Sequence, residues 1–184
     1  MRIKSKWYNK ERPKTVEENA RALAYITSRV AFNAAKEMYD KGFTFPSDVS
    51  RVETVGEFAA FLIQVADRLV YERMDEAERR EFITTLALGV ADTMADNLQD
   101  VRGEGDHKRA YIDRLNARLD DYSECRFDDE AQEPGYQFRS YLGHKVAEAV
   151  GGEESKWVVE HVAEIEALEA VDNLKKGLKG LFAE

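Results

Sequence analysis

Hydrophobic residues recur along this chain at intervals of three and four, the spacing that places them on one face of an α-helix. Prolines occur only at positions 13, 46 and 134, and nearly every glycine lies near an expected helix end or in a connector, so long stretches contain no strong helix breaker. No segment alternates every second residue for long enough to form a sheet strand. The pattern therefore predicts an all-α, single-domain bundle of about six helices.

Polar capping residues mark where the first three helices are expected to begin. Thr15, Ser50 and Asp75 are each followed three residues later by glutamate, which is the spacing of a capping box. They predict one helix over residues 16–41, a second from Ser50 to about Met74, and a third after Asp75. Because the second and third helices follow one another almost directly, we expect them to form an antiparallel hairpin.

Connectors separate the remaining helices. Residues 42–46 are expected to form an extended connector whose two phenylalanines reach the core, because Pro46 and the short length disfavour a sheet strand. Asp106 can cap a fourth helix after a glycine-containing break, and Pro134 suits the first turn of a fifth helix after an acidic connector. A sixth helix then accounts for the rest of the chain.

The last helix carries eight apolar positions between Val158 and Leu181, with a mean spacing of about 3.3 residues. This spacing is shorter than the turn of an α-helix, which holds about 3.6 residues, so the apolar stripe drifts around a straight helix. We therefore expect a bend or break near Asp172-Asn173, or two partners packed on different faces of the segment.

The chain is acidic, with 36 Asp and Glu against 27 Lys and Arg and a net charge of −9 over 184 residues. Residues 1–14 run against this trend, because they hold six basic residues and one acidic residue. A basic arm with Trp7 and Tyr8 could grip phosphates and stack on bases, but the acidic body, residues 15–184, would repel a polyanion. We therefore expect the arm to fold back on the acidic surface or to fray in solvent, rather than to bind nucleic acid.

Apolar run length and cysteine content indicate the compartment. No apolar run approaches the length that spans a bilayer, and no apolar stretch follows the charged N-terminus as a signal peptide requires. Cys125 is the only cysteine, so the chain can form neither an intramolecular disulfide nor a multi-cysteine zinc site, which fits a reducing compartment. We expect a cytoplasmic protein with no membrane partner.

The common catalytic and nucleotide-binding signatures are missing from the sequence. GxGxxG, GxxxxGK[ST], GxSxG and HExxH do not occur. A di-iron carboxylate bundle needs two Glu-x-x-His pairs on helices, whereas only Glu104 and His107 have this spacing, in a glycine-broken connector. His144 can pair with Glu148 one turn later, and His161 is expected to be a hydrogen-bonded, partly buried core residue. We therefore expect no cofactor.

Two groups of carboxylates are the candidate metal ligands. They are Asp67, Asp92 and Asp96 on the second and third expected helices, and Asp120, Asp121 and Glu124 at the end of the fourth. The second group has the DDxxE spacing and is similar to the motif with which some all-α isoprenoid enzymes hold magnesium and a diphosphate. The first group resembles the carboxylates that magnesium-dependent helical nucleotide pyrophosphatases draw from neighbouring helices, which implies a divalent cation there. For both groups a solvated acidic surface is the simpler expectation.

The C-terminal segment from about Val171 is the expected docking element, because lysines alternate there with apolar residues. Its apolar positions are Leu174, Leu178, Leu181 and Phe182. The same segment could instead close the protein's own core or form a homodimer. We expect a cytoplasmic helical protein-interaction module, such as an adaptor, regulator or assembly factor, with a protein partner or a second copy. The alternative is a small metal-dependent hydrolase that acts on a phosphorylated metabolite through the candidate carboxylates.

Overall fold

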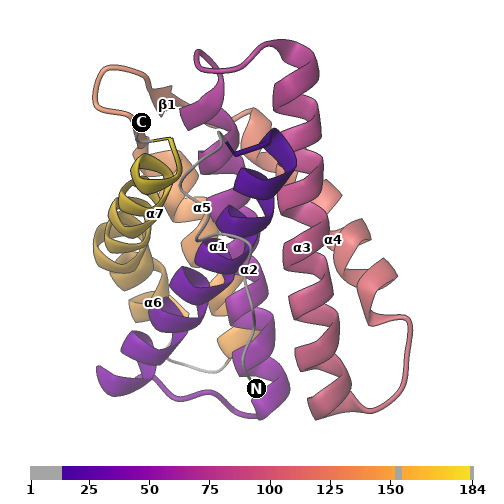
Figure 1. Ribbon diagram of the computed structural model, residues 1–184. Coiled ribbons are helices and arrows are strands. Elements are labelled where there is room, and N and C mark those ends of the chain that lie inside the picture. Colours follow the sequence, from indigo (N-terminus) through magenta and orange to yellow (C-terminus); the bar gives the residue numbers. More distant parts are fainter. Residues whose placement is uncertain (1–13, 152–154, 183–184) are drawn as a thin grey trace.

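The computed structural model describes residues 14–151 and 155–182 of the chain. Its long helices run alternately up and down along one axis, and α4 lies on the other side of α3 from α1 (Figure 1). The helices are α1 (Val16–Asp40), α2 (Asp48–Val70), α3 (Glu76–Arg102), α4 (His107–Ser123), α5 (Tyr136–Val150), α6 (Ser155–His161), the π-helix η2 (Val162–Glu166) and α7 (Ala167–Leu181). Because α6, η2 and α7 form one interrupted helix, this part of the chain contains the six predicted helices, and the all-α prediction is confirmed.

Side-chain caps begin several of these helices where the sequence predicts them. Thr15 and Asp75 each form a complete capping box. The side chain of the cap accepts a hydrogen bond from the backbone N–H of the glutamate three residues later, and the carboxylate of that glutamate accepts one from the backbone N–H of the cap. Asp106 accepts from the N–H of Arg109 at 3.2 Å and so caps α4. Local sequence therefore determines where α1, α3 and α4 start.

The start of α2 differs from the prediction. Ser47, not Ser50, is its N-cap and accepts from the N–H of Ser50 at 3.1 Å. Ser47 follows Pro46 directly and has an extended backbone, as an N-cap residue requires. Its side-chain oxygen is therefore placed to accept from a free N–H in the first turn of α2. Ser50 lies inside the helix, where its hydroxyl donates to the carbonyl of Ala149 at 2.5 Å and ties α2 to the end of α5.

The start of α5 is also corrected. Pro134 lies in strand β2 (Glu133–Pro134), which pairs antiparallel with β1 (Phe127–Asp128), and helix α5 begins two residues later. Gly135 is the N-cap residue, and its N–H donates to the carbonyl of Arg126 at 3.0 Å. This bond extends the hairpin beyond Pro134, so the proline ends a strand and does not open the helix.

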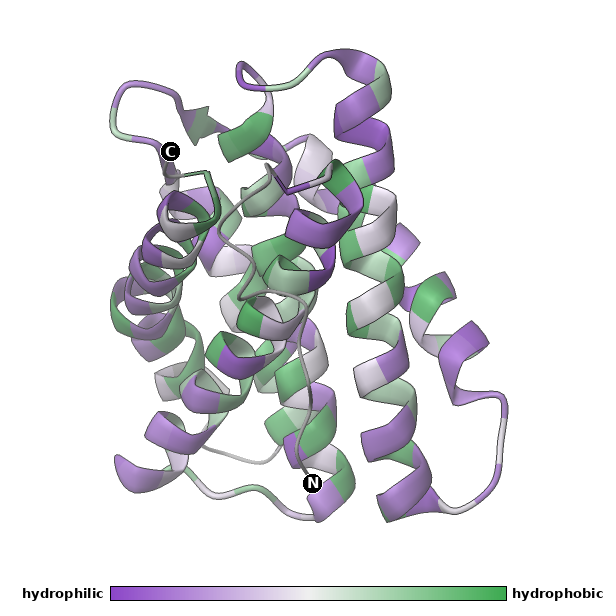
Figure 2. Ribbon diagram, in the orientation of Figure 1, coloured by the Kyte–Doolittle hydropathy of each residue, from purple (hydrophilic) through white to green (hydrophobic). Residues whose placement is uncertain are grey.

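Helix α2 lies at the centre of the core. Every residue from 54 to 66 is buried, and α1, α3, α4, α5 and α7 all pack against it. The surrounding helices turn hydrophobic residues toward the bundle and hydrophilic residues outward (Figure 2). Phe43 and Phe45 of the connector after α1 also pack against this core, as the sequence predicts. One apolar helix wrapped by amphipathic ones is thus the basis of the fold.

The C-terminal helix is interrupted earlier than expected. Residues 162–166 form a π-helix, and α7 continues without a break through Asp172-Asn173, so the predicted position was wrong. A π turn holds more residues than an α turn and shifts the phase of the apolar stripe at that point. The carbonyl of Ala163, in this wide turn, accepts from Nη1 of Arg139 on α5 at 2.6 Å. Helix α7 packs against both α1 and α2, in line with the second alternative, two partners on different faces.

The two remaining sequence predictions concern the N-terminal arm and membrane-spanning helices. The basic arm, residues 1–14, lies outside the described residues apart from Lys14. None of the helices in the described ranges combines the length and the hydropathy that a bilayer span requires.

Candidate functional site

The candidate carboxylates of α2 and α3 do not share one set of contacts in the described part of the chain. Asp67 is partly buried, and its Oδ1 lies 3.3 Å from Nε of Arg79. Its burial raises the pKa of the Asp67 carboxyl above the ordinary value. Asp92 pairs with Lys108 of α4 at 2.5 Å, and Asp96 is exposed. Among the described residues, none of these acids belongs to a group of three potential ligands within 4.8 Å of one another.

The second predicted group, at the end of α4, is also dispersed. Asp120, Asp121 and Glu124 are exposed, and Glu124 is the C-cap residue of the helix. The carboxylate of Asp121 accepts a hydrogen bond from the hydroxyl of Tyr141 on α5. These acids thus form an acidic surface beside a helix–helix contact, and within the described part of the chain they too are absent from any three-ligand group.

The predicted docking residues lie inward. Leu174, Leu178 and Leu181 are buried in the protein's own core, and Phe182 packs its ring 5.9 Å from that of Phe82. This burial corrects the prediction that they form an exposed docking surface. The alternative, that the segment closes the core, agrees with the structure, because the apolar edge of α7 faces α1 and α2.

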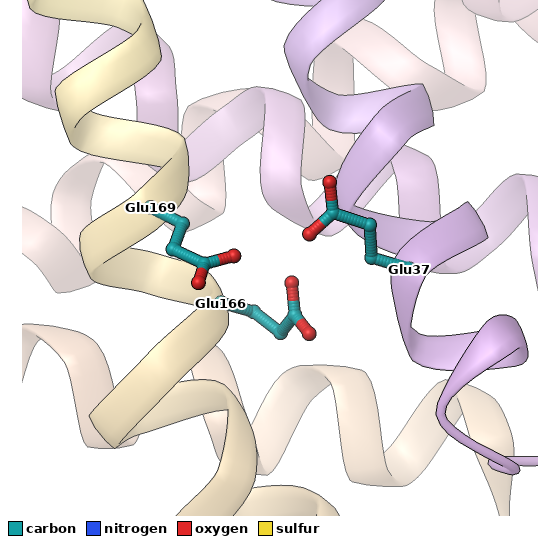
Figure 3. Close-up of side chains that lie close together, drawn as sticks. All are labelled: Glu37, Glu166 and Glu169. Carbon is teal, nitrogen blue, oxygen red and sulfur yellow. The ribbon is translucent and has the colours of Figure 1, made fainter.

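Three carboxylates that the sequence did not single out meet where α1 approaches the C-terminal helix. Glu37 comes from α1, Glu166 from the end of η2 and Glu169 from α7, and their side chains point toward one another (Figure 3). Glu166 is only 1% exposed. Its Oε1 lies 2.7 Å from Nζ of Lys41 and 2.9 Å from Nε2 of His161, so two nitrogen atoms contact this buried oxygen. We call these three acids the carboxylate cluster.

Electrostatics in the carboxylate cluster favour a bound proton and a bound ammonium group. Burial, the hydrogen bond to Glu169 and the charge of Glu166 together raise the pKa of Glu37. The hydrogen bond from Lys41 to Glu166 raises the pKa of the ammonium group. Lys41 already occupies one oxygen of Glu166, so a divalent cation at the three carboxylates would lie beside this ammonium group and be repelled by it.

Only the parts of this arrangement that lie within one helix follow from the sequence spacing. His161 is hydrogen-bonded and partly buried, as predicted, and its ring lies 4.8 Å from that of Phe43. Glu166 and Glu169 are three residues apart on the last helix, and Glu37 and Lys41 are four apart at the end of α1. The meeting of these two pairs depends on how α7 packs on α1, and no local pattern indicates it.

A second buried ion pair connects α2 with α4. Glu57 accepts two hydrogen bonds from Arg118, from Nε at 2.7 Å and from Nη2 at 3.0 Å. About two turns of α4 earlier, the hydroxyl of Tyr111 donates to the carbonyl of Gly56 at 3.0 Å. These contacts fix the register of the two helices.

Exposed aromatic residues form a stripe on the outer side of α1. Tyr25, Phe32 and Tyr39 are 65%, 44% and 63% exposed, and each follows the previous one by seven residues. Seven residues are about two helical turns, so the three rings share one side of the helix. We call Tyr25, Phe32 and Tyr39 the aromatic face. The hydrophobic pattern does not single out this face, because the core stripe of α1 already accounts for the helical spacing there.

No protein-family model, curated protein or solved structure matches this chain.

Proposed function

We propose that this chain is a cytoplasmic helical protein-interaction module that associates with a second copy of itself through the aromatic face of α1. The observation that carries the proposal is the exposure of three large rings on one side of a single helix. Such a row of rings in water is typical of a contact surface, since aromatic residues contribute strongly to protein interfaces. The lone, buried cysteine supports a reducing compartment.

The spacing of the aromatic face supports a second copy as the partner. Tyr25 and Tyr39 lie at equal distances along the helix on either side of Phe32. If two copies of α1 pair antiparallel about a two-fold axis at Phe32, that ring meets its own copy and each Tyr25 meets the Tyr39 opposite. Interfaces between two identical chains require such self-complementary patches.

Charge at the rim of the aromatic face fits the same register. The antiparallel pairing brings Asp40 of one copy to within one turn of Arg21 of the other. Both residues are exposed, and their present partners are on their own helix, Lys36 for Asp40 and Glu17 for Arg21. Opposite charges at both ends of the contact would favour the antiparallel orientation, against the repulsion between Arg29 of one copy and Lys36 of the other, which the same register places side by side.

The test is the molecular mass of the full chain in solution, measured by sedimentation over a range of concentrations up to about 0.1 mM. We expect a reversible dimer. Replacing the central ring, Phe32→Asp, should weaken dimerisation by at least about tenfold, because a charge would be buried at the two-fold axis.

A matched control removes a different exposed ring. Trp157, on α6, is 72% exposed, and Trp157→Gln should leave the dissociation constant unchanged. A chain that remains monomeric at the highest concentration would contradict the proposal. So would a dimer that Phe32→Asp leaves intact.

A further inference from the structure

A cavity opens at the end of the bundle where α2 and α7 finish and the β1–β2 hairpin turns. Its volume is about 320 Å³. It is lined by Leu69, Arg73, Gln132, Lys175, Leu178 and Lys179. Lys175 holds the tip of the hairpin beside α7, since its Nζ lies 3.4 Å from the carbonyl oxygen of Ala131. Three separate parts of the chain therefore build the cavity, and the carboxylate cluster lies at the opposite end of α7 (Figure 1).

The cavity is positively charged in a chain whose net charge is −9. Three of its six lining residues are cations, and none is an acid. Lys175 has a carboxylate oxygen of Glu133 at 3.6 Å. Within residues 14–151 and 155–182, no ion pair engages Arg73 or Lys179. Cations gathered in a concave site repel one another and attract an anion, because the protein walls focus their field.

The floor of the cavity is apolar. Leu69 and Leu178 line it, although both are almost completely buried. A bare inorganic ion would leave this floor in contact with water, whereas a ligand with a carbon skeleton would cover it. The volume lies at the lower end of the range for small-molecule sites, so the ligand is small.

We propose that this cavity binds a small organic phosphate monoester. Arg73, Lys175 and Lys179 hold the phosphate, and the carbon skeleton lies on Leu69 and Leu178. A phosphate monoester carries a charge of about −1.5 to −2 at neutral pH, which matches three cations, one of them partly neutralised, better than a single carboxylate does. The guanidinium of Arg73 can donate two parallel hydrogen bonds to phosphate oxygens. This site is independent of the aromatic face on α1.

The test is isothermal titration calorimetry of the full chain with two probes, phenyl phosphate and inorganic phosphate. Phenyl phosphate should bind more tightly than inorganic phosphate, because its ring covers the apolar floor. Lys179→Gln should weaken phenyl phosphate binding by about tenfold or more, the effect of losing a hydrogen bond to a charged group. The double variant Arg73→Gln/Lys179→Gln should abolish it. Both side chains are exposed, so the variants should fold normally.

Lys176 provides a matched control, since it lies on the same helix and is exposed but does not line the cavity. Lys176→Gln changes the net charge by the same amount and should leave binding unchanged. An equal loss in Lys176→Gln and Lys179→Gln would overturn the proposal, because binding would then depend on overall charge. Equal affinity for the two probes, or no heat from phenyl phosphate, would also overturn it. So would binding to vesicles that contain phosphatidic acid without binding to phenyl phosphate, since the ligand would then be a lipid surface.

Discussion

The contact of Glu37 with Glu169 and Glu166 makes one residue of α1 sensitive to pH. Because the pKa of Glu37 is raised in the folded protein, the folded state binds this proton more tightly than the unfolded chain does. The resulting stabilisation is complete below the ordinary glutamate pKa of 4.5 and is lost as the pH rises through the higher folded-state pKa. Above that folded-state pKa the ionised Glu37 therefore faces two other carboxylates at a cost to stability.

Replacing Glu37 by glutamine should remove this pH dependence. The free energy of unfolding of Glu37→Gln, relative to that of the unmodified chain, should rise between about pH 4 and about pH 7, because glutamine carries no charge to repel Glu166 and Glu169. Urea denaturation at the two pH values measures the difference. Glu81→Gln, an exposed acid of α3 outside the carboxylate cluster, is the control and should show a smaller change. A pH-independent difference for Glu37→Gln would contradict this account.

At the residue scale, contacts between residues that are near in the chain are predictable from the sequence. Thr15, Asp75 and Asp106 cap their helices because each meets a backbone N–H three residues later. Contacts between distant residues are not predictable in this way. Glu57 and Arg118 are 61 residues apart, and only the packing of α4 on α2 brings them together. Charged residues on two helices have many possible partners, and the sequence does not state which pair will be buried.

At the scale of elements, α5 and α6 approach unusually closely, and glycine makes this possible. A Cβ atom on Gly143 would lie 2.6 Å from the carbonyl oxygen of Val159 and 3.0 Å from its Cα atom. These atoms belong to the backbone and cannot rotate away. Gly143→Ala should therefore force the two helices apart and lower the free energy of unfolding by about 1–3 kcal/mol.

The control for this prediction is a helical glycine with open space around it. A Cβ atom on Gly180, in α7, would have no neighbour within 4 Å. Gly180→Ala should leave stability unchanged or raise it by up to about 1 kcal/mol, because alanine favours the helix. Chemical denaturation of both variants compares the effects. If Gly143→Ala were as stable as Gly180→Ala, the close approach of α5 and α6 would not constrain the fold.

The elements themselves were largely predictable, and the exceptions have tertiary causes. Helical spacing and breakers gave the number of helices and most of their limits. The last helix is interrupted at residues 162–166, before the bend or break that the sequence predicts near Asp172-Asn173, and Arg139 of another helix donates to a carbonyl of this wide turn. Pro134 was assigned to α5 because a strand of two residues has no detectable alternation. The exposed aromatic face of α1 was not predicted, because the hydrophobic spacing along a helix identifies its buried side.

At the scale of the whole molecule, the burial of the last helix determines how far removing it lowers the stability of the fold. A chain ending at Asp172 would lose Leu174, Leu178 and Leu181 from the core. Each buried leucine contributes about 2–5 kcal/mol, and their sum reaches the total stability of an ordinary domain, about 5–15 kcal/mol.

We therefore expect the truncated chain to lack a cooperative thermal transition, as measured by circular dichroism. Leu174→Ala in the full chain should unfold cooperatively at a lower temperature, because one cavity removes only part of the stability. A truncated chain with native-like helicity and a sharp transition would show that the segment is dispensable, as an exposed docking element would be.

The central position of α2 has a further consequence for the exchange of amide hydrogens with solvent deuterium. Residues 54–66 are all buried beneath five other helices, so water reaches their amides only after the bundle has come apart. Slow isotope exchange along this one segment therefore reports the free energy of opening the entire fold, without denaturant, while the outer helices can open one at a time and exchange sooner.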